Sequence, residues 1–161
     1  MPEIIRIGFG GGCHWCTEAV FQRLKGVEDV TQGYLNTTTD DLYSEGILLK
    51  FDPEIIPVKV LIEIHIRTHQ SFHNHSMRDK YKSGIYVFNK NQKTEVVRNL
   101  HQLQEKFSEK IITEVYTIKV FKESREEIKN YYNKDPHRPF CIKYIEPKLD
   151  ILRMEFKKYL K

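Results

Sequence analysis

The chain has 161 residues with the composition of a globular protein, 40% of them hydrophobic, 12% aromatic and 30% charged. It is long enough to bury a sizeable core without disulfides, and we expect one domain over residues 1–161. The sequence has no run of the roughly 20 apolar residues that a membrane helix needs, and Arg6 interrupts the apolar N-terminus too early for a secretory signal. We therefore expect a cytoplasmic protein that does not bind membranes.

The formal net charge is +4, and acidic residues are interleaved with the basic ones along most of the chain. Basic residues gather only near the C-terminus, at Lys157, Lys158 and Lys161. This distribution indicates a solvated surface and argues against a nucleic-acid partner. The three cysteines are an odd number, which does not suit a framework of structural disulfides.

Hydrophobic patterns and turn residues predict the elements in chain order. We expect strands over residues 4–9, 27–34, 46–51, 84–88 and 113–121, and helices over 15–25, 91–107, 125–133 and from Pro147 onward. Residues 58–68 fit both a strand and a helical face, and Pro57 before them favours a helix. A turn is expected over residues 36–41, and a loop around Cys141. The alternation of strands and helices predicts an α/β-layered or α+β sandwich.

The most informative motif is the run Gly-Gly-Gly-Cys-His-Trp-Cys at residues 10–16. Glycines let the backbone turn tightly between the first strand and the first helix, which brings Cys13 to a helix N-terminus. Unpaired N–H groups and the helix dipole favour an anion there, and a thiolate is a nucleophile. The setting therefore favours a reactive Cys13 over a simply packed one. Glu18 and Lys25 are expected on the solvated face of the helix that follows.

With residues 17–21 and the pair Gly33-Tyr34, this loop resembles the A-type peptide methionine sulfoxide reductases. The resemblance continues in chain order over residues 44–47, 51–53, 80–86, 131–132, 139–141 and 146–149. It implies a two-layer α+β sandwich with a ferredoxin-like core and a long irregular C-terminal segment. It also implies an enzyme of protein repair, which reduces the S-epimer of methionine sulfoxide, free or in oxidised proteins.

The resemblance also implies roles for individual residues. Cys13 attacks the sulfoxide sulfur and becomes a sulfenic acid, while Glu45 donates the proton that the sulfoxide oxygen needs. Tyr81 matches a tyrosine whose hydroxyl holds that oxygen. Cys16 or Cys141 then forms a disulfide with the oxidised cysteine, and the residues leave open which of them does so. Thioredoxin or another dithiol then reduces the disulfide, so the reaction requires no cofactor. We expect the protein to be a monomer.

Departures from the family pattern fall on the oxygen-binding site. A family phenylalanine is His14 here and a family aspartate is Ser76, while the loop between Tyr34 and Glu45 is short and lacks a second oxygen-binding tyrosine. Tyr43 or His14 is the candidate substitute for that tyrosine. We expect the substrate site to be formed by His14, Trp15, Tyr34 and Tyr43. Within this site, Trp15 is expected to form a wall for the substrate methyl group.

Three other interpretations use the same residues. A Cys-x-x-Cys thiol oxidoreductase would need only Cys13 and Cys16. A reductase-like protein without activity would only bind oxidised or methionine-rich partners. A zinc site formed by these cysteines with His65 and His69 lacks a regular ligand spacing, so we expect no metal.

Overall fold

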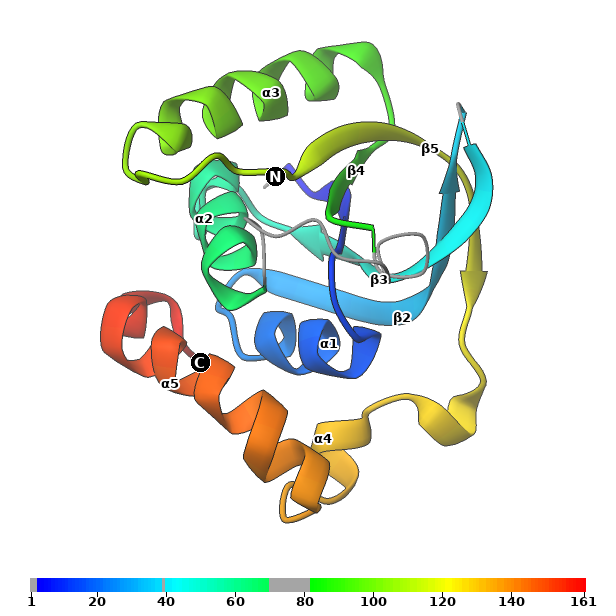
Figure 1. Ribbon diagram of the computed structural model, residues 1–161, viewed down its shortest axis with the longest axis vertical. Helices are drawn as coiled ribbons and strands as arrows, with labels where there is room; N and C mark the ends of the chain where they lie inside the picture. The colour runs from blue at the N-terminus through cyan, green and yellow to red at the C-terminus, as the bar shows by residue number, and fades with distance from the viewer. Residues whose placement is uncertain (1–2, 39, 70–81) are drawn as a thin grey trace.

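The computed structural model describes residues 3–38, 40–69 and 82–161, with the side chains of residues 40 and 41 excepted (Figure 1). The strands are β1 (Ile5–Gly10), β2 (Val27–Thr37), β3 (Asp40–Phe51), β4 (Gly84–Val87) and β5 (Glu114–Glu123). The helices are α1 (His14–Gln22), α2 (Val58–Thr68), α3 (Lys90–Gln104), α4 (Tyr131–Lys134) and α5 (Glu146–Glu155). Short 3-10 turns cover Glu126–Ile128 and Lys157–Tyr159, and a π-helical turn covers Cys141–Ile145.

Most predicted elements are confirmed, including a helix over residues 58–68 that begins after Pro57. Two predictions are wrong. The short helix over 125–133 is instead two helical turns separated at Asn130, whose left-handed backbone (φ 54°) breaks the helix. Cys141 does not lie in a loop, because it begins a helical turn.

The five strands form a closed barrel in the order β1-β3-β2-β5-β4. Strand β4 closes it, since it pairs antiparallel with β1 and parallel with β5. Register shifts interrupt the β2–β3 hairpin between Glu28 and Thr31 and between Leu35 and Thr37. Such irregularities increase local twist, which brings the outer strands together. The expected mixture of helices and strands is confirmed, whereas the two-layer sandwich with a ferredoxin-like core is not.

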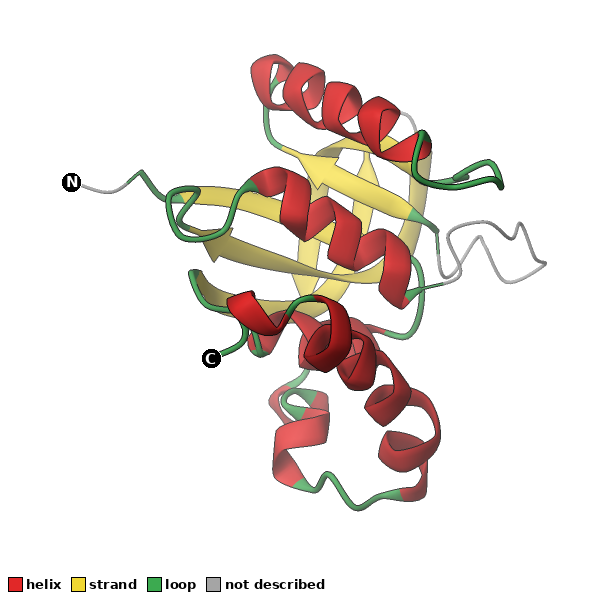
Figure 2. Ribbon diagram, turned by 90° about the vertical axis from the view of Figure 1, so that its left-hand side faces the viewer, coloured by secondary structure: helices red, strands yellow, loops and turns green. Residues whose placement is uncertain are grey.

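The helices pack on the outside of the strands, and the C-terminal segment lies at one end of the barrel (Figure 2). Helix α1 follows β1 directly, and Phe9 at the end of β1 stacks on Phe21 of α1 with 4.7 Å between ring centroids. Both rings are fully buried. The contact packs the C-terminal end of α1 against the barrel.

After β5, the chain passes along α1 and then returns through α5 to the turn after α1 (Figure 1). The Lys161 N–H donates to Arg23 O at 2.9 Å, and the Lys25 N–H donates to Tyr159 O at 2.7 Å. The C-terminal segment is therefore tied to the turn that follows α1. No helix within the described residues has the length and apolar character to cross a membrane.

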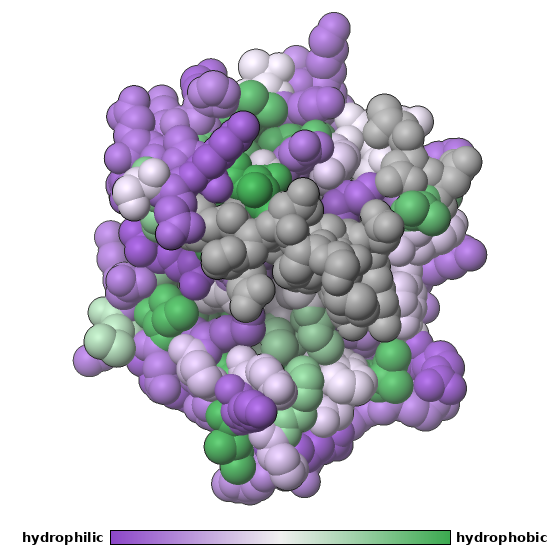
Figure 3. Space-filling view, viewed as in Figure 1, coloured by the Kyte–Doolittle hydropathy of each residue, from purple (hydrophilic) through white to green (hydrophobic). Residues whose placement is uncertain are grey.

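The surface seen in Figure 3 is mostly hydrophilic, with apolar residues in separate small patches. Exposed large apolar side chains include Ile142, Tyr144 and Met154 on the C-terminal segment. Single exposed apolar residues are common on folded proteins.

Candidate active site

Cys13 lies at the N-terminus of α1, immediately before the first helical residue. Its carbonyl accepts hydrogen bonds from the N–H groups of Cys16 at 3.1 Å and Thr17 at 3.2 Å, which start the helix. The loop depends on Gly11, whose φ of 145° is a conformation that other residues rarely adopt. A Cβ atom there would also lie 2.5 Å from His69 Cδ2. The glycine run thus places Cys13 where a helix N-terminus favours negative charge.

The Cys13 and Cys16 thiols are hydrogen-bonded to each other. This bond lowers the pKa of Cys16, and the positive charge of Lys148 acts in the same direction against the effect of burial. The same bond, together with burial, raises the pKa of Cys13, although the Trp15 backbone N–H opposes this. The interaction thus shifts the two thiols in opposite directions, with the pKa of Cys16 lowered and that of Cys13 raised.

Lys148 is a site residue that the sequence analysis did not identify. It lies on α5, and its ammonium donates a hydrogen bond to Thr68 O at the end of α2. Burial lowers the pKa of Lys148, whereas the negative charge shared by Cys16 and Cys13 raises it. The residue lies in the 146–149 stretch that resembles the family, and this was the only sign of it in the sequence.

His14 and Glu45 form a buried pair next to the thiols, with 4% and 6% of their surfaces exposed. His14 Nε2 lies 3.2 Å from Glu45 Oε1, and the His14 backbone N–H donates to the same oxygen at 3.3 Å. The other ring nitrogen, Nδ1, lies 3.3 Å from Gly33 O, and a carbonyl only accepts, so Nδ1 carries a proton. His14 Nε2 and the Glu45 carboxyl group therefore face each other at hydrogen-bonding distance.

The predicted substrate-site aromatics are brought together only in part. Tyr34 is the cross-strand partner of Glu45, and its ring meets the His14 ring edge-on with 5.4 Å between centroids. Tyr43 is two residues from Glu45 on β3, but its ring contacts the Lys122 ammonium, 4.4 Å from the ring centroid. Tyr34 therefore joins the His14 pair, whereas Tyr43 packs towards β5.

Trp15 is held by the C-terminal segment. Its ring stacks on Tyr131 with 4.0 Å between centroids and an angle of 6°, and Phe140 packs edge-on against it. The indole N–H donates to Ile128 O at 3.1 Å. One face of the predicted substrate wall is thus already covered by Tyr131.

Cys141 is fully buried, and its thiol donates to Asp135 O at 3.5 Å. Burial raises its pKa, and the negative charge of Cys16 contributes in the same direction. The residue directly follows Phe140, which contacts Trp15. The three cysteines consequently belong to one region of the molecule.

The prediction for Glu18 is wrong, because only 2% of this residue is exposed. Its carboxylate accepts hydrogen bonds from Gln32 Nε2 and from the N–H groups of Asn130 and Tyr131. Burial raises the pKa of Glu18, and the hydrogen bonds partly offset this. Lys25 is exposed as expected.

The predicted Tyr81 and the neighbouring Ser76 lie outside the described residues. His65 and His69, the alternative zinc ligands, support the glycine loop instead. His65 Nε2 donates to Gly10 O at 2.6 Å, while His69 donates to His65 O and contacts Ser83 Oγ at 2.7 Å. Within the part of the chain that the structure describes, no group of three His, Cys, Asp or Glu side chains is arranged to hold a metal.

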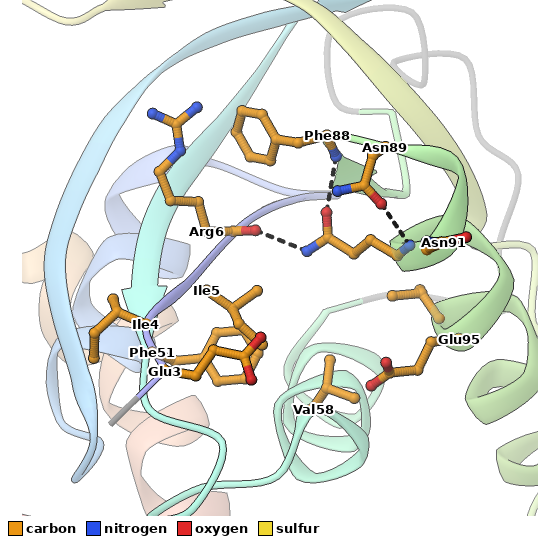
Figure 4. Close-up of a pocket in the computed structure, with 12 residues that line it drawn as sticks. Glu3, Ile4, Ile5, Arg6, Phe51, Val58, Phe88, Asn89, Asn91 and Glu95 are labelled. Atoms are coloured by element: carbon orange, nitrogen blue, oxygen red, sulfur yellow. Dashed lines mark hydrogen bonds between the residues drawn. The ribbon is translucent and has the colours of Figure 1, made fainter. Parts of the chain in front are cut away.

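A pocket of about 520 Å³ lies at the other end of β1, between β1, β3, α2 and α3 (Figure 4). Gln92 crosses it, donating to Arg6 O at 2.8 Å and accepting from the Phe88 N–H at 2.8 Å. The pocket is lined by none of the predicted site residues, so it is separate from the cysteine site.

Known proteins resemble this chain along almost its whole length. A family model described as peptide methionine sulfoxide reductase matches residues 5–160. The peptide methionine sulfoxide reductase MsrA of Psychrobacter sp. (strain PRwf-1) is 33% identical, covering 94% of this chain and 95% of the relative. The MsrA of Pasteurella multocida is 32% identical, with 95% of this chain and 97% of the relative covered.

Solved structures agree in fold at lower identity. The reduced form of Mxr1 from Saccharomyces cerevisiae has a TM-score of 0.71 at 23% identity, covering 86% of this chain and 90% of that one. Mxr1 in complex with Trx2 has a TM-score of 0.61 at 22% identity, with 78% and 84% covered. The methionine sulfoxide reductase A of Corynebacterium diphtheriae has a TM-score of 0.66 at 20% identity, with 84% and 77% covered.

Proposed function

Because this chain belongs to the peptide methionine sulfoxide reductase family, we propose that it reduces methionine-(S)-sulfoxide, free or in oxidised proteins, at the Cys13 loop. The observation that carries the proposal is a hydrogen-bonded thiol pair, Cys13 and Cys16, at a helix N-terminus beside the buried His14–Glu45 pair. A sulfoxide needs both groups, since a nucleophile must reach its sulfur while a proton reaches its oxygen.

The first step transfers oxygen from the substrate to Cys13. The Cys13 sulfur bonds to the sulfoxide sulfur as its proton passes to the Cys16 thiolate, and the Glu45–His14 pair protonates the sulfoxide oxygen. The bond between the two sulfurs then breaks as the hydroxyl group passes from the substrate sulfur to Cys13. Methionine leaves with its sulfur reduced by two electrons, and Cys13 becomes a sulfenic acid, oxidised by two electrons. In this step Cys16 acts as the base for Cys13, a role that follows from the thiol hydrogen bond.

The next steps return Cys13 to a thiol. Cys16 attacks the sulfenic sulfur, so that a Cys13–Cys16 disulfide forms and water leaves. Cys141 then attacks Cys16, which forms a Cys16–Cys141 disulfide and frees Cys13. A dithiol such as thioredoxin reduces this disulfide, and the cycle balances without a cofactor. This order assigns the first resolving role to Cys16, because Cys16 is the thiol that contacts Cys13.

Other parts of the site follow from the family. Tyr81 holds the sulfoxide oxygen, while Trp15 and Tyr34 line the substrate site and Tyr43 lies further along it. We place the reaction in the cytoplasm, where a reducing environment keeps the cysteines free, and we assign a monomer.

The test is turnover of the separate S- and R-epimers of N-acetyl-methionine sulfoxide with excess dithiothreitol. We expect release of N-acetyl-methionine from the S-epimer alone. Equal turnover of both epimers would contradict the assigned specificity, and turnover of neither would contradict the function.

A thiol-disulfide oxidoreductase is the second candidate, favoured by the lowered pKa of Cys16 in a Cys-x-x-Cys motif at a helix N-terminus. Such an activity needs neither Glu45 nor Cys141. Reduction of a disulfide-bonded substrate that survives Glu45→Gln, without any sulfoxide turnover by the parent, would favour it.

A further inference from the structure

Glu18 joins α1 to a distant part of the chain. It lies three residues after Trp15 and therefore on the same side of the helix. Its Oε1 accepts from Gln32 Nε2 at 2.9 Å and from the Tyr131 N–H at 3.4 Å, and its Oε2 accepts from the Asn130 N–H at 3.0 Å. The two backbone donors lie more than a hundred residues later, at the start of α4.

The same stretch is held at a second point. Ile128 O accepts from Trp15 Nε1 at 3.1 Å and from Gln32 Nε2 at 3.0 Å. Gln32 thus donates both to Glu18 and to the C-terminal segment, and its own side chain is fully buried. Together these contacts fix residues 128–131 against α1 and β2.

The position of Cys141 depends on this stretch. Tyr131 stacks on Trp15, and Phe140 meets both rings edge-on, with centroid distances of 5.6 Å to Trp15 and 5.8 Å to Tyr131. Cys141 follows Phe140 directly and is fully buried in the same cluster. If residues 128–131 left α1, the support for the Phe140–Cys141 turn would be lost with them.

We propose that Glu18 is a positioning residue, whose carboxylate seats residues 128–131 on α1 so that Cys141 is in place to attack the Cys13–Cys16 disulfide. The inference rests on the proposed function, in which Cys141 takes part in the second thiol step. In that step Cys141 bonds to Cys16 as the Cys13–Cys16 bond breaks, and the Cys141 proton passes to Cys13, which leaves as a thiol. Glu18 touches neither the substrate nor the reacting sulfurs.

The experiment compares the parent with Glu18→Gln, which is nearly isosteric but cannot accept all three hydrogen bonds. The proteins react with N-acetyl-methionine-(S)-sulfoxide without reductant, are quenched by alkylation at intervals, and their disulfides are mapped by mass spectrometry. The matched control is Glu127→Gln, an exposed carboxylate on the same segment. Circular dichroism establishes that each variant is folded.

We expect Glu18→Gln to release the first methionine at the parent rate but to accumulate the Cys13–Cys16 disulfide. Exchange to Cys16–Cys141 should slow by about tenfold, because the hydrogen bonds of a buried charged group are lost. Glu127→Gln should behave as the parent. A merely structural defect would slow methionine release and exchange together. Should Glu18→Gln not fold, Gln32→Leu weakens the same anchor and should give the same pattern.

Three outcomes overturn the proposal. Exchange at the parent rate in folded Glu18→Gln shows that the anchor is not needed. A parent that releases methionine but never forms a disulfide with Cys141 removes the step that Glu18 would serve, while the proposed function stands. A parent that releases no methionine overturns the proposed function, and the role of Glu18 with it.

Discussion

Glu45 Oε1 is the meeting point of two contacts from His14, one from the backbone N–H at 3.3 Å and one from ring Nε2 at 3.2 Å. Both residues are buried, so a proton shared between them would be shielded from bulk water. In the proposed mechanism this pair supplies the proton for the sulfoxide oxygen. The imidazole stands where the resemblance places a family phenylalanine, so the proposed acid has a titratable partner.

Removal of the proposed acid, Glu45, should lower the rate of the chemical step. Glu45→Gln keeps the shape of the side chain but cannot protonate the sulfoxide oxygen, and general acid catalysis contributes about 10²–10⁴-fold to rate. We expect kcat/KM for the S-epimer to fall by about 100-fold or more. Alkylation of Cys13 measures whether the thiol itself is intact, and an unchanged kcat/KM would exclude Glu45 as the acid.

Removal of Cys16 should make Cys13 more acidic. The Cys16 thiol raises the pKa of Cys13 through their hydrogen bond, so Cys16→Ser should shift the alkylation profile of Cys13 to lower pH. Thiolate absorbance in the ultraviolet during a pH titration provides the same comparison. A shift to higher pH would show that Cys16 stabilises the Cys13 thiolate instead.

Lys148 supplies positive charge to the thiol pair, so Lys148→Met should raise the pKa of Cys16. The alkylation rate of Cys16 in Cys13→Ser, with and without Lys148→Met, measures the effect. Lys157→Met, in the exposed C-terminal turn, is the matched control. If Cys16 were alkylated with the same pH dependence in Lys148→Met and Lys157→Met, the charge of Lys148 would have no effect on the Cys16 thiol.

Glu18 should give stability a defined pH dependence. Burial raises its pKa above the ordinary value of 4.5, so between pH 4.5 and the folded-state pKa the folded protein binds more protons than the unfolded one. The contribution of Glu18 to the free energy of unfolding therefore falls as pH rises through this window. Urea unfolding of the parent and Glu18→Gln should show their difference in stability declining towards higher pH, and a difference that grows would contradict the assignment.

The glycine loop offers a matched pair of substitutions. Gly11→Ala places a Cβ against His69 at a φ of 145°, whereas a Cβ at Gly12 meets no atom within 4 Å among the described residues. Strained backbone of this kind costs about 1–3 kcal/mol. We expect Gly11→Ala to lower the urea midpoint and activity, and Gly12→Ala to leave the midpoint close to that of the parent. Equal midpoints would contradict the structure of the loop.

The sequence predicted local features better than distant ones. Apolar periodicity left residues 58–68 open between strand and helix, and Pro57 before them favoured the helix that forms. The glycine run was sufficient to place Cys13 at a helix N-terminus. Closure of the barrel depends on pairing of β4 with two strands and on register shifts in β2, none of which a hydrophobic pattern encodes.

The same limit applies within the site. The sequence predicted a solvated position for Glu18, because the backbone N–H groups that bind its carboxylate, at Asn130 and Tyr131, lie far along the chain. The burial of Cys141 and the charge of Lys148 near the thiols likewise arise only when the C-terminal segment packs on α1. The thiol hydrogen bond depends on the side-chain arrangement of the first helical turn, and it raises the pKa of Cys13, which the motif alone led us to expect to be lowered.

The most direct measurement counts the N-acetyl-methionine released from N-acetyl-methionine-(S)-sulfoxide in the absence of any reductant, for the parent and for Cys13→Ser. The proposed cycle predicts about two equivalents per chain from the parent, since Cys13 is freed once by exchange, and about one from Cys141→Ser. Cys13→Ser should release none. Release by folded Cys13→Ser equal to that of the parent, or no release by the parent, would contradict the account.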